Sequence, residues 1–315
     1  GGSEADITRI LRLGTRGSAL ALVQSGWVAE RIRNRHPDAT VELVTIRTQG
    51  DILHDVPLAG IGGKGIFIRE IEEVLLRGDV DLAVHSMKDL PAELPEPLDI
   101  AAIPPREDPR DVLISKRNQQ MEEMSGGARI GTGSLRRGVQ LRNRRPDLEI
   151  VPLRGNLDTR IRKLGAEQLD GVIVAAAGLR RMGWAGRISQ FLPMEMMLPA
   201  VGQGAIGIEI RRDDARCREI VDCLNDPVTA VEVGAERAFL KRLGGGCQLP
   251  IAGFAKTSGR EMAVEGLVGS LDGRIVIRRQ LRGPAEAFAA LGEDLAERIL
   301  AEGGRKLLDA LYEPA

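Results

Sequence analysis

The sequence has little of several residue types, and each shortage excludes a class of protein. Three cysteines without paired spacing exclude a disulfide framework, and with only three histidines they also argue against a zinc site. No apolar run approaches the roughly 18 residues that a membrane-spanning helix needs. The first ten residues lack the apolar segment of a secretory signal. We therefore expect a cytoplasmic protein, or one of an organelle stroma or matrix, in a reducing compartment.

The charge balance narrows the range of partners. The 315 residues carry 44 basic and 45 acidic side chains, for a formal net charge of -1, which argues against a general nucleic-acid binder. Seven of the basic residues are lysines and 37 are arginines, the side chain that grips carboxylates with two hydrogen bonds. We expect a monomer that binds a small molecule and contacts neither nucleic acid nor membrane.

The N-terminal part follows an α/β pattern. A strand with Leu11 and Leu13 breaks at the turn 14–18, and Ser18 is a good N-cap for a helix over residues 19–35. Arg16 lies in this strand-to-helix turn, a position that favours an anion. A glycine-rich connection, residues 49–65, is long enough to be a functional loop.

The stretch VHSMKDLP, residues 84–91, ends the next alternating strand with a crowd of polar side chains. The ends of strands are where α/β proteins place ligands, which makes Lys88 and Asp89 candidates. A solvated loop, with Asp89 forming a turn before Pro91, is the alternative reading. We interpret His85 as structural.

The middle of the chain repeats the βαβ rhythm of a parallel sheet, in which residues 170–183 are expected to form a buried apolar strand that leads into a polar turn. Three successive strand ends carry arginine, and parallel strands would gather these turns at one edge as a cationic cleft between domains. Ordinary exposed loops are the alternative, since arginine is abundant. The residues concerned are Ser134, Arg136, Arg137, Arg154, Arg160, Arg180 and Arg181. Because no phosphate-cradling glycine loop precedes these helices, the pattern favours carboxylates over phosphates.

The remainder predicts a change of architecture. Three consecutive antiparallel strands and an amphipathic helix from about residue 284 to 299 indicate a small α+β module. We predict an α/β fold with two doubly wound domains and this third domain. Their expected boundaries are 1–104 with 200–224 for the first, 105–199 for the second and 225–315 for the third.

Cys247 lies in GGGCQLP, where glycines and a proline would expose its thiol on a tight loop. A lone cysteine is usually structural, and the sequence shows no convincing cysteine–histidine pair for hydrolysis. Covalent attachment of a cofactor, in contrast, needs only an accessible thiolate. The glycine motif at 202–207 precedes a strand rather than a helix, so it does not indicate a dinucleotide site.

Seven motifs, in their order and spacing, resemble those of the porphobilinogen deaminase (hydroxymethylbilane synthase) family. They are GTRGSALAL, GGKGIF, AVHSMKDLP, GTGSLRR, LRGNLDTRI, LPAVGQGAIGIE and GGGCQLP. The resemblance covers nearly the whole chain and is weakest after about Gly259. Its departures are mild, since Gly133 replaces a serine and Leu90 a valine often found in the family.

The resemblance implies two domains similar to type II periplasmic binding proteins and a transferase that joins four porphobilinogen molecules into hydroxymethylbilane, on a covalent dipyrromethane primer. It implies that Cys247 bears this cofactor through a thioether and that Asp89 is the catalytic carboxylate, beside the pyrrole nitrogens where positive charge develops. The cofactor's acetate and propionate groups would contact Lys88, Ser134, Arg136, Arg137 and Arg160. The substrate's side chains would contact Arg16, Ser18, Arg154 and Arg181. The 49–65 loop would be a lid.

A non-enzymatic solute-binding protein is the alternative from another class. Two βαβ domains with an arginine cleft also describe a binder of organic acids. A pure binder, however, needs neither a covalent thiol at Cys247 nor a carboxylate such as Asp89 among its arginines.

Overall fold

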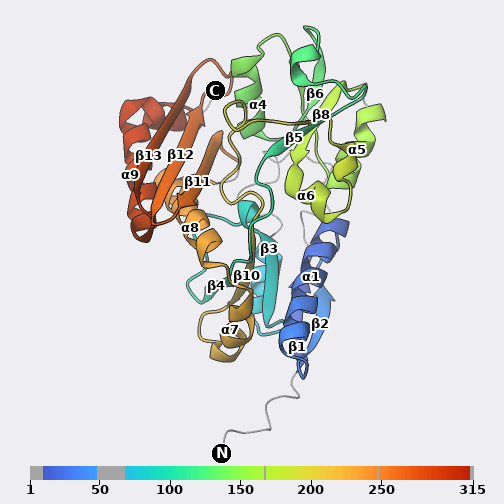
Figure 1. The fold of residues 1–315 in the computed structure, drawn as a ribbon, viewed down its shortest axis with the longest axis vertical. Helices are drawn as coiled ribbons and strands as arrows, with labels where there is room; N and C mark the ends of the chain where they lie inside the picture. The colour runs from blue at the N-terminus through green and yellow to red at the C-terminus, as the bar shows by residue number, and fades with distance from the viewer. Residues whose placement is uncertain (1–9, 48–67, 167, 247, 313–315) are drawn as a thin grey trace, which may run out of the picture. The chain divides into compact units, whose positions relative to one another are not determined.

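The computed structural model describes residues 10–47, 68–166, 168–246 and 248–312. The chain divides into two compact units (Figure 1). Unit 1 comprises Gly1–Arg106 and Ala205–Ala230, and unit 2 comprises Glu107–Gly204 and Val231–Ala315. The predicted separation of a third domain from the second stays a prediction. Cys247 and the 49–65 loop lie outside the described residues.

Unit 1 is built on a five-stranded sheet in the order β2-β1-β3-β10-β4. Its strands are β1 (Ile10–Thr15), β2 (Thr40–Thr45), β3 (Leu82–Ser86), β4 (Leu98–Ala102) and β10 (Ile206–Arg211). The strands β2, β1 and β3 are parallel, whereas β10 runs antiparallel to both β3 and β4. The strand expected near residues 206–210 does return to the first sheet, as the sequence suggested.

Helices cover both faces of this sheet. They are α1 (Ala19–Arg35), α3 (Arg69–Leu76) and α7 (Ala215–Val221), with short 3-10 turns η3 (Met87–Asp89) and η6 (Asp222–Leu224). Val28 of α1 and Val221 of α7 pack into one core with Leu82 of β3. Ile71 of α3 packs into the other core with Ala83, the next residue of β3. Neighbouring residues of one strand thus point to opposite faces, as the two-residue period of a strand requires.

Unit 2 repeats this layout in a sheet of order β7-β6-β8-β5-β9. Its strands are β5 (Asp111–Ser115), β6 (Arg129–Gly131), β7 (Glu149–Val151), β8 (Gly171–Ala175) and β9 (Gln190–Phe191). Its helices are α4 (Leu135–Arg144), α5 (Leu157–Ala166) and α6 (Ala176–Arg181), with 3-10 turns η4 (Met121–Glu123) and η5 (Ala185–Arg187). Leu141 of α4 packs into one core, and Leu157 of α5 and Leu179 of α6 pack into the other.

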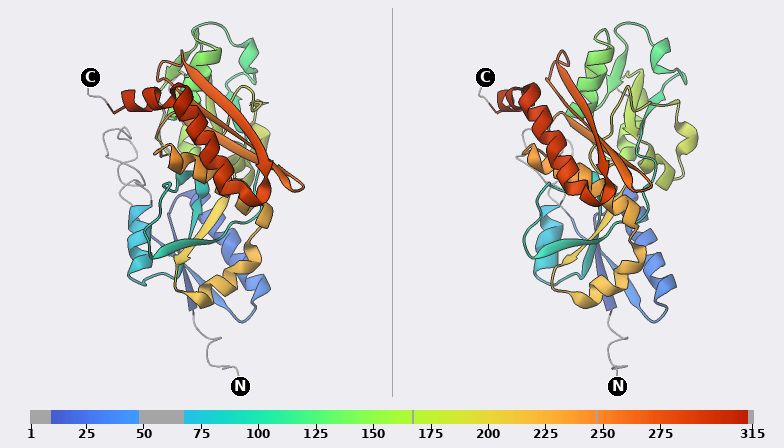
Figure 2. Two further views of the ribbon diagram at one scale, coloured as in Figure 1. Left: turned by 90° about the vertical axis from the view of Figure 1, so that its left-hand side faces the viewer. Right: turned by 60° about the vertical axis from the view of Figure 1, so that its left-hand side comes forward.

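A smaller antiparallel sheet, β11-β12-β13, also belongs to unit 2. It consists of β11 (Ile251–Ser258), β12 (Glu261–Gly269) and β13 (Val276–Pro284), preceded by α8 (Pro227–Arg242), which begins in unit 1. After it come η7 (Ala285–Ala287), α9 (Phe288–Ile299), a π-type turn (Leu300–Gly304) and α10 (Arg305–Ala310). Both views of Figure 2 show α9 lying along this sheet, and it contacts β12 and β13.

The predicted class is confirmed: the protein is α/β, with two doubly wound sheets and a small α+β module. Two details of the prediction are wrong. Both large sheets are mixed rather than parallel, because β10 and β5 run against their neighbours. The apolar run 170–183 is not a strand throughout, since β8 ends at Ala175 and α6 follows at once. A short apolar run fits a buried helix as well as a strand, so its pattern could not separate them.

Candidate functional site

In unit 1 the polar turn after β3 is a single 3-10 turn, Met87–Asp89. Met87 and Leu90 point into the core, which leaves Lys88 and Asp89 half-buried on the outer side. The turn is fixed at both ends, because the Met87 amide donates to the Ala205 carbonyl at 2.9 Å and the Leu90 amide donates to Met87 at 3.2 Å. Asp89 therefore stands on a backbone with little freedom.

The second polar turn of unit 1 follows β1, the parallel neighbour of β3. Carboxyl ends of parallel strands share one edge of a sheet, so Arg16 lies on the same edge as Asp89. Arg16 is half-buried, and Ser18 caps α1 by accepting the Ala21 amide at 3.3 Å. The predicted N-cap and the predicted bounds of α1 are both confirmed.

Three titratable side chains lie beneath this edge in the α3 face of the sheet. His85 is 5% exposed, and its Nε2 lies 2.8 Å from Oε1 of the fully buried Glu209 on β10. Glu72 of α3 is close enough to Glu209 for a side-chain hydrogen bond and the charge of Glu209 to raise the pKa of Glu72. Our interpretation of His85 as structural accords with its burial, although its partners were not foreseen. We call these three residues the acid–histidine chain.

In unit 2 the turn after β6 begins α4. Ser134 is its N-cap and accepts the Arg137 amide at 3.1 Å. Arg136 and Arg137 are 5% and 4% exposed, and both contact Asp111, which is completely buried at the start of β5. Arg136 Nη1 lies 2.7 Å from Asp111 Oδ2, and Arg137 Nη2 lies 2.8 Å from Oδ1. We call Asp111, Arg136 and Arg137 the arginine pair site.

The other predicted arginines lie at neighbouring turns of the same sheet. Arg154 follows β7, and Arg160 is in α5, where its Nε donates to the Gly155 carbonyl at 2.9 Å. Arg181 closes α6 and donates to the Gly204 carbonyl at 2.8 Å. All three are half-buried. Since β6 pairs in parallel with both β7 and β8, these turns do share one sheet edge, as expected.

The charges of the arginine pair site are unequal, because two guanidinium groups contact one carboxylate. Burial lowers the pKa of Arg137, the charge of Asp111 opposes this effect, and the charge of Arg136 adds to it. Buried cations are costly unless anions accompany them. The N-terminus of α4 adds partial positive charge at the same place. This arrangement suits a ligand with carboxylate groups, which accept hydrogen bonds from guanidinium N–H donors.

Sequence reasoning missed the buried partners of these sites. Asp111 was not singled out, nor was Gln203, whose Nε2 donates to Asp111 Oδ1 at 3.1 Å. Glu72 and Glu209 were also missed. The one available signal was a charged residue within an otherwise apolar strand, as for Glu209 in IGIEI. Such residues are rarely buried without a partner.

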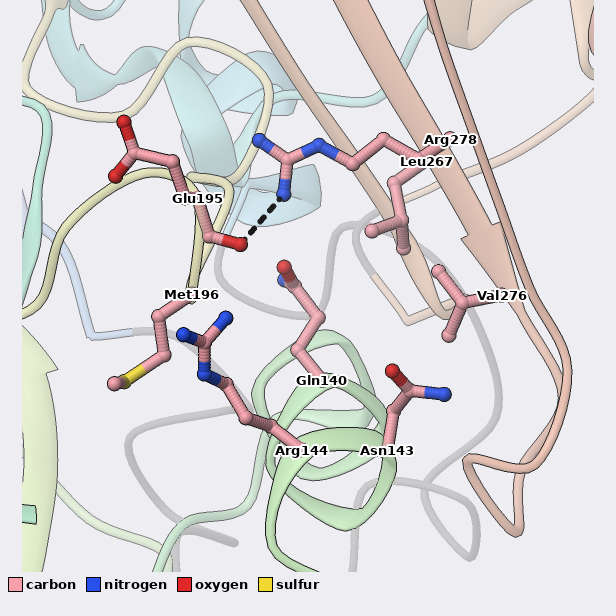
Figure 3. A pocket seen from close by; sticks show the side chains of 8 residues that line it. All are labelled: Gln140, Asn143, Arg144, Glu195, Met196, Leu267, Val276 and Arg278. Atoms are coloured by element: carbon pink, nitrogen blue, oxygen red, sulfur yellow. Dashed lines mark hydrogen bonds between the residues drawn. The ribbon is translucent and has the colours of Figure 1, made fainter. Parts of the chain in front are cut away.

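A cavity of about 150 Å³ lies in unit 2 and holds none of the predicted site residues (Figure 3). It is lined by Gln140, Asn143, Arg144, Glu195, Met196, Leu267, Val276 and Arg278. Arg278 Nη1 donates to the Glu195 carbonyl at 3.2 Å, as drawn in Figure 3. The α4 residues that line it come from the C-terminal half of that helix, whereas Ser134, Arg136 and Arg137 belong to its beginning. The cavity is therefore separate from the arginine pair site.

Within the described ranges, no helix has the length and apolarity to cross a bilayer. The same residues contain no group of three or more histidine, cysteine or acidic side chains suited to holding a metal ion.

Two family models match the chain. Residues 11–219 match "Porphobilinogen deaminase, dipyromethane cofactor binding domain", and residues 230–301 match "Porphobilinogen deaminase, C-terminal domain". The porphobilinogen deaminase of Syntrophus aciditrophicus is 60% identical over 303 residues, covering 96% of this chain and 99% of that protein. That of Geotalea daltonii is 50% identical over 303 residues, covering 96% and 95%.

Solved structures with a similar arrangement include the methionine-binding protein MetQ, with a TM-score of 0.44 and 13% identity, covering 72% of this chain and 94% of that one. A probable amino-acid transporter binding protein from Bacillus subtilis gives a TM-score of 0.41 and 10% identity, covering 69% and 90%.

Proposed function

This chain belongs to the porphobilinogen deaminase family, and we propose that Asp89 is its catalytic carboxylate and Cys247 its cofactor-bearing thiol. The enzyme deaminates four porphobilinogen molecules and joins them head to tail into hydroxymethylbilane, on a covalently attached dipyrromethane primer. It is a transferase of tetrapyrrole and haem biosynthesis that forms carbon–carbon bonds and releases ammonia. The family match excludes the alternative of a non-enzymatic solute-binding protein.

The proposed role of Asp89 is to stabilise the positive charge that develops on the pyrrole during the reaction. Loss of ammonia from porphobilinogen leaves an electron-poor pyrrole whose nitrogen becomes more acidic. A carboxylate next to that nitrogen accepts its hydrogen bond and stabilises the developing cation. The same carboxylate takes up a proton when the ring regains aromaticity. The fixed 3-10 turn that carries Asp89 supports this role, since such a group must be held still to act.

In unit 1, Arg16 and Ser18 bind the substrate's acidic side chains, whereas Lys88 contacts the carboxylate groups of the cofactor. Arg16 and Ser18 lie on the edge that Asp89 occupies, and Lys88 directly precedes Asp89. Arg16 supplies a fork of N–H donors that matches a carboxylate, whereas Lys88 acts as a point charge. In unit 2, Arg154 and Arg181 would play the part of Arg16.

Unit 2 holds the cofactor. Ser134, Arg136, Arg137 and Arg160 would contact its acetate and propionate groups. When bound, the dipyrromethane supplies a pyrrole with a nucleophilic α-carbon that accepts the first substrate unit. The excess positive charge of the arginine pair site is the observation that carries this proposal. Asp111 and Gln203 orient the two guanidinium groups and do not themselves contact the ligand.

Burial makes the described thiols poor attachment points. Cys217 is buried in α7, and burial raises its pKa to about 12, so at neutral pH it is not a thiolate. Cys223 is exposed, but partial burial also raises its pKa. Thiolates, not thiols, are the nucleophiles in such attachments. The raised pKa values of the other two thiols support Cys247 as the attachment point that we propose.

The experiment is the intact mass of the chain made in cells that supply porphobilinogen. We expect an excess equal to two linked pyrrole units in the wild type and in Cys223→Ala, the matched control with an exposed thiol. We expect Cys247→Ala to have the bare mass. An excess that persists in Cys247→Ala would contradict the attachment site, and a bare wild-type chain would contradict the cofactor.

We further propose that the enzyme is a cytoplasmic monomer whose only partners are its small-molecule substrates. The near-neutral charge and the absence of long apolar runs support this view. Three domains, divided as the sequence predicted, also remain our proposal. The separate family match of residues 230–301 supports the third of them.

A further inference from the structure

The acid–histidine chain lies directly beneath the turn that carries Asp89. His85 and Ala83 share the α3 face of β3, and the antiparallel partner of Ala83 is Glu209. The partner of His85 is Gly207, which has no side chain, so the imidazole has room to reach Glu209 diagonally. A Cβ at position 207 would clash with the sulfur of Met87, the first residue of the turn. Sheet, histidine and turn therefore share one tightly filled space.

The direction of the hydrogen bonds follows from the protonation states. Burial, together with the hydrogen bond and the charge of Glu209, raises the pKa of Glu72 to about 9, so Glu72 carries a proton at neutral pH. Burial lowers the pKa of His85 to about 4, against the charges of Glu72 and Asp89. His85 is therefore neutral. With a neutral ring, the His85 Nε2–H donates to Glu209 Oε1, and the protonated Glu72 is the donor toward Glu209.

This arrangement is more than a filled core. Three polar side chains from α3, β10 and β3 occupy space where apolar residues would cost less, because each buried polar group must be kept satisfied. His85, a member of the acid–histidine chain, directly precedes the segment 86–89 in the sequence. Asp89 is close enough for its charge to act on His85. The charge of Glu209 acts on Glu72, and Glu209 also contacts His85, so the three side chains are linked through Glu209.

Building on the proposed role of Asp89, we propose that the acid–histidine chain is a set of positioning residues that fix the Lys88–Asp89 turn for the reaction. Glu72 holds Glu209 in place, Glu209 orients the His85 ring, and the ring supports the backbone from which Asp89 projects. None of the three touches the substrate. Removal of the Glu72 donor takes one hydrogen bond from Glu209, and we expect Glu209 and the His85 ring bonded to it to shift.

The test compares Glu72→Leu, Glu72→Gln and Glu73→Leu in holoenzyme whose cofactor content is verified by intact mass. Leu removes the donor, whereas Gln retains an N–H that can donate to Glu209. Glu73 is exposed on the same helix, so Glu73→Leu is the matched control. A misplacement of about 1 Å costs on the order of a hundredfold in rate. We expect kcat to fall about tenfold to a hundredfold in Glu72→Leu with KM within about twofold, and to recover largely in Glu72→Gln.

A second readout separates positioning from stability. With only three histidines in the chain, ¹⁵N imidazole spectra can follow His85 directly. We expect a neutral ring protonated on Nε2 near pH 7 in the wild type and in Glu72→Gln, and a changed tautomer balance in Glu72→Leu. Unchanged kcat in a folded, cofactor-loaded Glu72→Leu would overturn the inference, as would a wild-type His85 protonated on both nitrogens. Absence of product from the wild type would instead overturn the proposed function.

Discussion

The two large sheets share a layout but carry opposite charge at comparable places. In each, three parallel strands are followed by a fourth that runs antiparallel, in the orders β2-β1-β3-β10-β4 and β7-β6-β8-β5-β9. Beneath the polar edge of the first sheet lies the acid–histidine chain, with two acidic side chains and a neutral imidazole. At the edge of the second lies the arginine pair site, with two cations and one carboxylate. One layout thus supports two kinds of chemistry.

The difference shows what each unit is suited to hold. A buried cluster with excess positive charge favours anions, which suits the carboxylate side chains of a cofactor. The other cluster combines one carboxylate with proton-bearing neighbours, and we propose that it supports the turn that carries Asp89. The two units therefore share a fold and differ in the charge of the ligand that each is suited to hold.

The largest effect on turnover is expected from removing the negative charge of Asp89 in unit 1. Asp89→Asn keeps the shape of the side chain but loses the carboxylate that we propose stabilises the cation and moves the proton. We expect turnover to fall by about 10²–10⁴-fold, the range typical of general acid–base groups. Steady-state product formation measures this, with Glu96→Gln on the exposed loop after the turn as control. Turnover within a few-fold of the wild type would rule out Asp89 as catalytic.

The next effect tests the cluster of unit 2. Asp111→Asn leaves two buried guanidinium groups without their shared carboxylate, and breaking a buried ion pair in this way costs about 3–5 kcal/mol. We expect the midpoint of urea unfolding to fall accordingly. Asp147→Asn breaks an exposed pair with Arg145 in the same unit and should change stability little. Equal losses in the free energy of unfolding would show that the buried cluster stabilises the protein no more than an exposed ion pair does.

A smaller, graded effect concerns pH. From about pH 4.5 to about 9, Glu72 binds one more proton in the folded state than in the unfolded state. Its ionisation therefore lowers the free energy of unfolding as pH rises. From about pH 4 to 6.5, His85 binds one proton fewer in the folded state than in the unfolded state. It therefore raises the free energy of unfolding as pH rises over that range. The two cancel up to about pH 6.5, and above it Glu72 alone acts, at about 1.4 kcal/mol per pH unit.

Urea unfolding of the wild type and Glu72→Gln at several values between pH 6.5 and 8.5 measures this slope. We expect the wild type to lose stability steadily and the variant to lose about 1.4 kcal/mol less per pH unit. Parallel curves would mean that Glu72 is ionised in the folded protein. The comparison between the two units would then fail, because the unit 1 cluster would carry two charges.

Much of the fold could be predicted from local signals. Ser18 and the apolar spacing after it gave the bounds of α1, and alternating residues gave β3 and the three strands of the small sheet. The sharing of one edge by the arginine turns also followed from the βαβ rhythm. These features depend on neighbours within a few turns of chain, where propensity and periodicity act directly.

The interior of the sites could not be predicted. Arg137 is paired with a residue 26 positions away, and His85 with one 124 positions away. No local pattern specifies such partners. The antiparallel direction of β10 has the same cause, since residues 206–211 alternate in the same way whichever direction they run. Sequence reasoning thus named the half-buried residues at the strand ends and missed the fully buried partners, such as Asp111 and Glu209.

The position of β10 has a consequence for synthesis on the ribosome. Every strand of the larger unit 2 sheet, β5 to β9, lies between residues 111 and 191, so that sheet has all its strands once this stretch has emerged. The unit 1 sheet lacks β10, its link between β3 and β4, until residue 211 is translated. A nascent chain halted near residue 204 would leave β4 without a strand beside it and His85 without Glu209. The later sheet in the chain is therefore the earlier one to be complete.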